Sequence, residues 1–187
     1  MRILAAGFLS IIGACLPMFA QSPPPGEIAL AYNYVRTNAP PGGCGCFSMN
    51  GGSVAGAYNF KKGLSLVGDL GVVHNGNVDS TNLDLTLVSY LFGPRYSLRR
   101  ENRRLVPFGQ VLLGGVHDSG RLSALSSGKS ANAFAMTAGG GLDVVLSPHL
   151  AIRVFQAEYF LTLLPNNVND RQNNFRLSIG VVIGLGR

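Results

Sequence analysis

The sequence has no tryptophan, and only 13% of its 187 residues are charged. Soluble domains commonly carry about 25% charged residues, so this surface is not built for water alone. The mean hydropathy is +0.25. Beyond the N-terminal segment, however, the sequence contains no apolar run of about 18 residues, the length that a membrane-spanning helix needs. These two absences together argue against an ordinary soluble domain and against a helical membrane protein.

The apolar residues are instead dispersed in alternation with small and polar ones. After a proline-rich leader at 23–25, turn-forming residues divide the chain into eight segments with strand character. Each is long enough for a transmembrane β-strand, which needs about nine to eleven residues. The segments are 27–37, 51–60, 64–74, 83–98, 105–117, 132–146, 150–161 and 174–185.

Alternation is clearest in the last segment, where every second residue is large and apolar. One face there carries Phe175, Leu177, Ile179, Val181, Ile183 and Leu185. Such alternation is typical of strands that show one face to lipid and the other to a barrel interior. Two strands break the period. We expect a β-bulge near Leu87, where the apolar phase changes, and another near Phe155, because Arg153 and Gln156 cannot both face inward in a regular strand.

The connections between these segments alternate in length. Those at 38–50, 75–82, 120–131 and 162–173 are long, and those at 61–63, 99–104 and 147–149 are short. Outer-membrane barrels combine short periplasmic turns with longer external loops. The sequence therefore predicts an all-β fold, an eight-stranded antiparallel up-and-down transmembrane β-barrel with both termini on the periplasmic side.

The first 20 residues have the pattern of a signal peptide. Met1 and Arg2 form a short positive region, residues 3–16 are mostly apolar, and residues 19–21 offer a cleavage point. We therefore expect a signal peptide at 1–20 and a barrel domain at 21–187. An alternative is open, because residues 12–15 resemble a lipobox in which Cys15 would be lipidated.

Three stretches, 42–47, 91–96 and 138–143, look like segments of bacterial outer-membrane barrel proteins. The mature chain resembles the OmpA-like and OmpW-like families of small single-domain barrels. The resemblance implies the outer membrane of a Gram-negative-type bacterium, with outer-membrane lipid and the barrel-assembly machinery as partners. It implies no general activity and no cofactor. One departure is the C-terminus, since such barrels usually end on an aromatic residue and this chain ends on Arg187.

Charges inside the strands must avoid lipid, because a Lys or Arg at mid-membrane costs about 2 to 4 kcal/mol. Counting from the turns predicts three inward pairs: Asp143 with Arg153, Asp69 with Arg95, and Glu158 with Arg176. We interpret these six residues as a structural ion-pair network. A proton or solute path is the functional alternative. Further candidates for the interior are Glu27 and Asp84.

Cys44 and Cys46 flank a glycine in the first long connection. Thiols seldom persist in an oxidising compartment, so we expect a disulfide that closes this loop. Surface redox chemistry or pairing with another chain is the alternative. Two cysteines alone are weak evidence for a metal, and we predict no metal site.

Basic residues gather at Lys61, Lys62 and within 99–104. No aromatic platform or recognition helix accompanies them, so we predict no nucleic-acid binding. They are better explained as solvated strand connections near anionic headgroups.

His117 and Ser119 lie two apart near a strand end, a spacing that puts both on one face. Lipid A deacylases use His and Ser with this spacing, so one alternative is a lipid A-modifying hydrolase, with Glu158 as a conceivable orienting acid. Another is a narrow channel for small solutes, and a soluble eight-stranded ligand binder is a fourth hypothesis. The favoured interpretation is a structural or surface-interaction barrel that is not an enzyme, with an external partner that the sequence does not identify.

Overall fold

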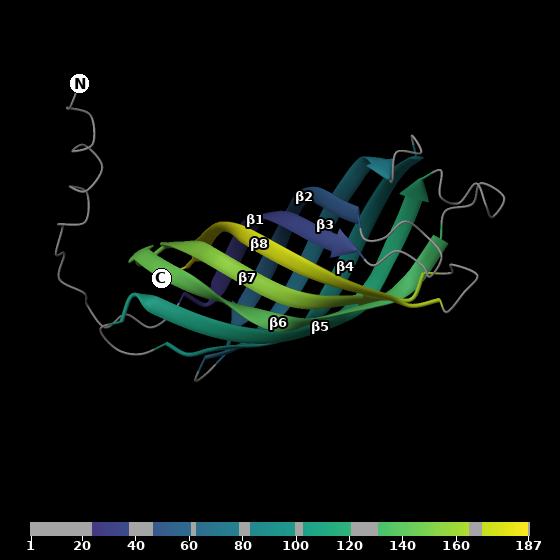
Figure 1. The fold of residues 1–187 in the computed structure, drawn as a ribbon. Helices are drawn as coiled ribbons and strands as arrows, with labels where there is room; N and C mark the ends of the chain where they lie inside the picture. The colour runs from purple at the N-terminus through teal and green to yellow at the C-terminus, as the bar shows by residue number, and fades with distance from the viewer. Residues whose placement is uncertain are drawn as a thin grey trace, which may run out of the picture.

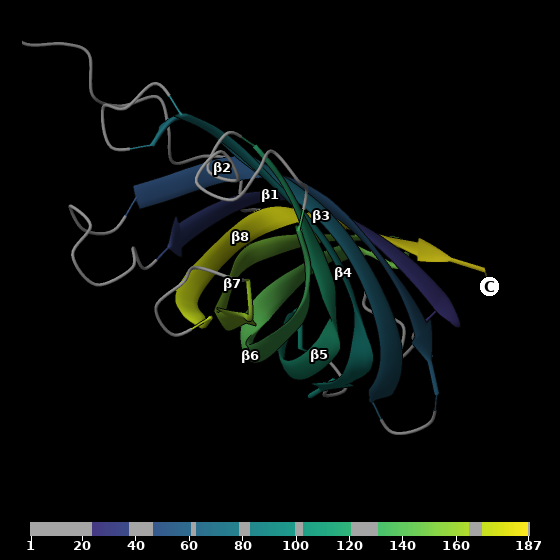
Figure 2. The ribbon, with the colours of Figure 1, turned by 90° about the vertical axis from the view of Figure 1, so that its right-hand side faces the viewer.

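The computed structural model describes residues 24–37, 47–60, 63–78, 83–99, 103–120, 131–164 and 170–186. These residues form eight antiparallel strands that close into a barrel in chain order (Figures 1 and 2). No helix of the described segments is long and apolar enough to cross a membrane. The strands are β1 (Gly26–Thr37), β2 (Phe47–Asn59), β3 (Leu64–Val78), β4 (Leu83–Ser97), β5 (Leu105–Gly120), β6 (Ala131–Ser147), β7 (Leu150–Thr162) and β8 (Gln172–Leu185).

The barrel closes where the first strand meets the last. Gly26 on β1 lies opposite Leu185 on β8, and Arg36 lies opposite Phe175. The predicted eight-stranded fold class is therefore confirmed. Most predicted bounds agree with the strands, but β2 begins earlier and β3 ends later than expected, because pairing continues up to Thr37 with Phe47 and to Val78 with Leu83.

Period-two alternation sets which side chains face outward. The predicted outward series of β8 is confirmed, because each of its six large apolar residues is exposed while Arg176, Ser178 and Val182 between them are buried. The outward faces of β1 and β3 are likewise apolar. An apolar outer wall around a buried interior is the arrangement that lipid requires.

The bulge predicted near Leu87 is wrong. Leu85, Leu87 and Leu91 on β4 are buried, whereas Tyr90 and Phe92 are exposed, so the strand keeps a single phase. Its register with β3 is regular across this stretch. Both faces of β4 are apolar because the leucines fill the barrel interior, and the sequence pattern alone cannot separate a filled interior from a phase change.

The irregularity predicted near Phe155 is confirmed. The pairing of β7 shifts between Arg153 and Gln156 on its β8 side, and next to Phe155 on its β6 side. Val154 and Phe155 are both exposed in succession, which returns Arg153 and Gln156 to the buried face. The bulge thus keeps two polar side chains out of lipid.

The connections divide between the two ends of the barrel. β1 starts and β8 ends at one end, which we call the terminal end; Figure 1 marks the C-terminus there. The connections that leave the opposite end, called the far end, are 38–46, 79–82, 121–130 and 163–171. The predicted alternation in length is wrong at one place: the far-end connection 79–82 is shorter than the terminal-end connection 98–104. β3 and β4 extend their pairing and take up residues that the sequence assigned to the loop.

Several sequence predictions lie outside the described residues. They concern the signal peptide at 1–20, the lipobox at Cys15, the disulfide between Cys44 and Cys46, and the basic pair Lys61 and Lys62. The side chain of Asp84 also lies outside the part that the structure describes.

Candidate functional site

Arg176 on β8 lies at the centre of the barrel interior between two carboxylates. Its Nε donates to Glu158 Oε2 at 2.7 Å, and one terminal nitrogen donates to Asp69 Oδ1 at 3.0 Å. Glu158 comes from the adjacent strand β7, whereas Asp69 reaches from β3 across the interior. The three side chains are nearly inaccessible, with 2%, 1% and 5% of Arg176, Glu158 and Asp69 exposed. Each charge therefore has an opposite charge in place of water.

A second ion pair joins β6 to β7 nearer the terminal end. Arg153 donates from two nitrogens to the two carboxylate oxygens of Asp143, at 2.8 and 3.0 Å. A further nitrogen of Arg153 donates to Gln156 Oε1 at 2.8 Å. The bulge described above makes this last contact geometrically available, because it turns Arg153 and Gln156 to the same face. The guanidinium thus has partners on both of its edges.

Arg95 does not pair with Asp69, so that sequence prediction is wrong. The β3–β4 register places Asp69 opposite Leu91 and Arg95 opposite Ser65, which leaves the two charges four residues apart along the hairpin. Arg95 Nε donates instead to Gln110 Oε1 at 2.8 Å. Gln110 in turn donates to Glu158 Oε1 at 2.8 Å, which links Arg95 to the central cluster.

Two residues of β5 were absent from the sequence prediction and connect the interior clusters. Gln110 bridges Arg95 and Glu158, as described above. The ring of Phe108 lies 4.8 Å from the guanidinium carbon of Arg95 and 4.5 Å from that of Arg153. Stacking over an aromatic face stabilises a desolvated guanidinium. The alternation along β5 was sufficient to predict that Phe108 and Gln110 face inward. The sequence prediction did not include them because it considered charged residues only.

The far-end half of the interior is mainly apolar, with buried hydroxyl and amide groups of Thr137, Thr162 and Asn174 among the apolar side chains. Most of the large inward-facing side chains there belong to one buried hydrophobic cluster, whose members come from all eight strands of the barrel. The cluster includes Val35, Met49, Val73, Leu85, Leu87 and Val116. Side chains buried to this degree fill the far-end half of the interior, as expected for a barrel of eight strands.

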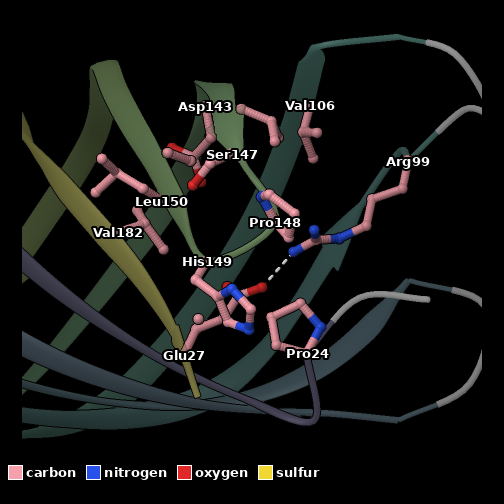
Figure 3. A pocket seen from close by; sticks show the side chains of 13 residues that line it. Pro24, Glu27, Arg99, Val106, Asp143, Ser147, Pro148, His149, Leu150 and Val182 are labelled. Atoms are coloured by element: carbon pink, nitrogen blue, oxygen red, sulfur yellow. Dashed lines mark hydrogen bonds and ion pairs between the residues drawn. The ribbon is translucent and has the colours of Figure 1, made fainter. Parts of the chain in front are cut away.

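The terminal end of the interior is closed by an ion pair and a proline. Arg99, just after β4, pairs with Glu27 on β1, and Asn59 Nδ2 donates to Glu27 Oε1 at 2.9 Å and to the Pro24 carbonyl at 2.8 Å. Figure 3 shows Pro24 beside this pair and His149 facing it. The cavity that they line is about 40 Å³, room for a few water molecules.

His117 and Ser119 lie on the outward parity of β5, and the structure does not join them to Glu158. Glu158 is buried in the interior, on the other side of the wall. The expectation that Glu158 orients His117 is therefore wrong. His117 Nδ1 instead hydrogen-bonds Asn132 Oδ1 on β6 at 2.8 Å. Within the described residues, no group of three or more His, Cys, Asp or Glu side chains is arranged to hold a metal ion.

A sequence model of the family described as "Outer membrane protein beta-barrel domain" matches residues 6–182. The chain belongs to this family. The protein is thus an outer-membrane β-barrel of the Gram-negative cell envelope, as its apolar outer wall and closed sheet require. No match was found among curated proteins.

Solved structures of other outer-membrane barrels share this fold. Neisserial surface protein A aligns with a TM-score of 0.63 at 14% identity, over 86% of this chain and 97% of that one. OprG from Pseudomonas aeruginosa aligns with a TM-score of 0.55 at 13% identity, over 88% and 98%. The N-terminal barrel domain of OprF from Pseudomonas aeruginosa gives 0.52 at 14%, over 84% and 96%. At these identities the likeness concerns the fold alone.

Proposed function

We propose that this outer-membrane barrel is a closed, non-conducting scaffold that presents its far-end connections at the cell surface for interaction. The ion pairs of the interior then have a structural role, and the protein is not an enzyme. The barrel-assembly machinery would act only during biogenesis. This orientation follows the rule that both termini of an even-stranded barrel lie in the periplasm.

The observation that carries the proposal is the filling of the interior along its whole length. Buried side chains, most of them apolar, occupy the far-end half. The cluster around Arg176 occupies the centre, and the Glu27–Arg99 pair closes the terminal end. Eight-stranded barrels have room for side chains or one small ligand, but not for a wide aqueous channel. A barrel of this kind offers a partner its connections rather than a passage.

Conductance across a planar lipid bilayer tests the closed interior. We expect purified, folded wild-type protein to give no stepwise currents. A matched control removes the three side chains that meet at the centre, by Asp69→Ala, Glu158→Ala and Arg176→Ala together. Currents from this variant, once folded, would show that the assay detects a barrel whose interior has been emptied. Stepwise currents from the wild-type protein at the level of that variant would contradict the proposal.

A further inference from the structure

The outward face of β1 to β4 contains an unusual gap in its apolar wall. Gly56 on β2 lies directly opposite Gly68 on β3. A Cβ atom built on Gly56 would meet nothing within 4 Å, and one built on Gly68 would meet only a ring carbon of Phe92 at 3.9 Å. The space outside these two glycines is therefore open, although large apolar residues surround it.

Two apolar hollows lie side by side on this face. One is floored by Gly56 and Gly68, and the other extends from it toward the far end over Gly52. Val54 and Leu70, which are direct partners across β2 and β3, belong to both linings and form the ridge between them. The side chains of Val54 and Leu70 are 50% and 64% exposed, so the ridge stands clear of its neighbours on the outer surface. The other large side chains lining the hollows are Leu30, Tyr32, Val72, Val88, Tyr90, Phe92 and Leu113.

The far-end hollow leads into a polar border on the same face. Tyr32 lines the hollow, and its hydroxyl donates to Asn50 Oδ1 at 2.7 Å. One step nearer the far end, an Arg36 terminal nitrogen donates to Ser48 Oγ at 2.9 Å. His74 lies opposite Asn50 on β3, on the same outward face. The polar border therefore combines hydroxyl and amide groups with two basic side chains.

The charge of this border favours an anion. Arg36 and His74 are both exposed, and the carboxylates on their strands β1 and β3, Glu27 and Asp69, are buried in the barrel interior. His74 Nδ1 hydrogen-bonds Thr86 Oγ1 at 2.9 Å, which leaves its other ring nitrogen directed away from that contact. Phosphate oxygens are the natural partners of such groups at a membrane border.

A second copy of the chain fits this face less well than a lipid. A two-fold symmetric pair in one membrane would place the same patch of each copy against the other. The exposed Arg36 and His74 of one copy would then lie near the same two basic side chains of the other copy. Acyl chains, in contrast, are flexible and apolar and can fill two hollows on either side of a ridge.

We propose that the two hollows seat acyl chains of one phosphorylated, multi-acylated lipid of the outer leaflet, whose phosphate contacts Arg36 and His74. The placement of Arg36 and His74 in the outer leaflet rests on the orientation given in the proposed function. The binding itself is measured on purified protein and does not depend on conductance, so the two proposals fail separately.

Native mass spectrometry of the folded, full-length mature protein in detergent tests the site. The probes are diphosphoryl hexa-acylated lipid A, the same lipid without its phosphates, and phosphatidylethanolamine. We expect wild-type protein to bind diphosphoryl lipid A with an apparent Kd about tenfold lower than that for phosphatidylethanolamine, a difference of about 1.4 kcal/mol.

Two pairs of substitutions separate the acyl and phosphate contributions. Gly56→Leu with Gly68→Leu fills the hollow and should weaken binding of both lipid A forms about tenfold. Arg36→Ala with His74→Ala should weaken only the diphosphoryl form. Matched controls on the outer wall are Ala157→Leu on β7 and Arg171→Ala at the far end, and both should bind as wild type does.

Folding of every variant is checked by the change in gel mobility on boiling. If the leucine pair does not fold, Val54→Ala with Leu70→Ala removes the ridge and should weaken binding of both lipid A forms. Equal binding of all three lipids by wild-type protein would overturn the proposal. So would equal losses in the controls, or lipid-free dimers that the substitutions at Gly56 and Gly68 abolish, since the face would then be occupied by a second copy.

Discussion

Arg176 illustrates how single residues hold the interior together. Its guanidinium contacts carboxylates from two strands that are not neighbours, and Phe160 lies below it with the ring centre 5.8 Å from the guanidinium carbon. Burial of three charges is costly, and their mutual attraction offsets that cost only while all partners remain in place. The arrangement therefore makes Glu158 and Asp69 dependent on one side chain.

Arg176→Ala is expected to lower the free energy of unfolding by about 3 to 5 kcal/mol, because two buried carboxylates lose their cation. Urea unfolding in detergent micelles, followed by far-UV circular dichroism, measures the change; the chain has no tryptophan for fluorescence. Adding Glu158→Gln and Asp69→Asn should recover part of the loss, since neutral amides need no counter-charge. A loss of equal size with and without those two changes would contradict the ion-pair interpretation.

An ion pair could be predicted from the sequence where its two residues lie on neighbouring strands. The structure places Asp143 beside Arg153 and Glu158 beside Arg176, and both pairs lie on neighbouring strands that follow one another in the chain. Asp69 finds its partner across the barrel, where the contact depends on closure of the whole sheet. Gln110 is neutral, so reasoning from charge alone had no means of including it.

Among the elements, β7 is shaped by a single extra residue. Val154 and Phe155 face outward in succession, and the register with both neighbouring strands shifts there. The sequence predicted this bulge because two polar side chains needed the same face. It predicted a second bulge in β4 wrongly, because apolar residues on both faces have two explanations and only the packed interior decides between them.

Deletion of Val154 is expected to be tolerated. The shortened strand would alternate regularly and keep Arg153 and Gln156 facing inward, so stability should change by less than about 1 kcal/mol. Deletion of Ala157 is the matched control. A regular strand would then keep Arg153 and Glu158 inward but turn Gln156 toward lipid and Phe155 into the filled interior, so folding should suffer more than in the Val154 deletion. The fraction folded, measured by gel mobility before and after boiling, distinguishes them. Equal loss of folding in both deletions would show that the bulge itself is required.

At the scale of the molecule, the barrel combines a wall made for lipid with an interior made of side chains. The eight strands and their order followed from alternation and turn residues, which are local properties. The lengths of the connections were predicted less well, since β3 and β4 continue pairing beyond the region where alternation is apolar. Which end faces outside is a property of the membrane rather than of the isolated fold.

An epitope inserted within 121–130 is expected to bind antibody on intact cells, because the proposed orientation places that connection outside. An epitope inserted between Pro148 and His149, in the terminal-end turn, is the matched control and should bind only after the outer membrane is permeabilised. Flow cytometry measures both. The reverse pattern would invert the orientation and overturn the proposed surface role.

The contact between Arg176 and Asp69 also has a consequence for how the barrel forms. The two residues are 107 positions apart in the sequence, and Arg176 belongs to the last strand. Contacts between residues so far apart in the sequence form late, because the chain must lose conformational entropy before the contact contributes any stabilising free energy. Asp69 thus has no arginine partner until β8 is placed beside β1. The charge of Asp69 is compensated in the step that joins the two edges of the sheet. An open, partly inserted barrel is therefore higher in free energy for two reasons, its unpaired strand edges and its uncompensated carboxylate. Closure is therefore expected to be all-or-none.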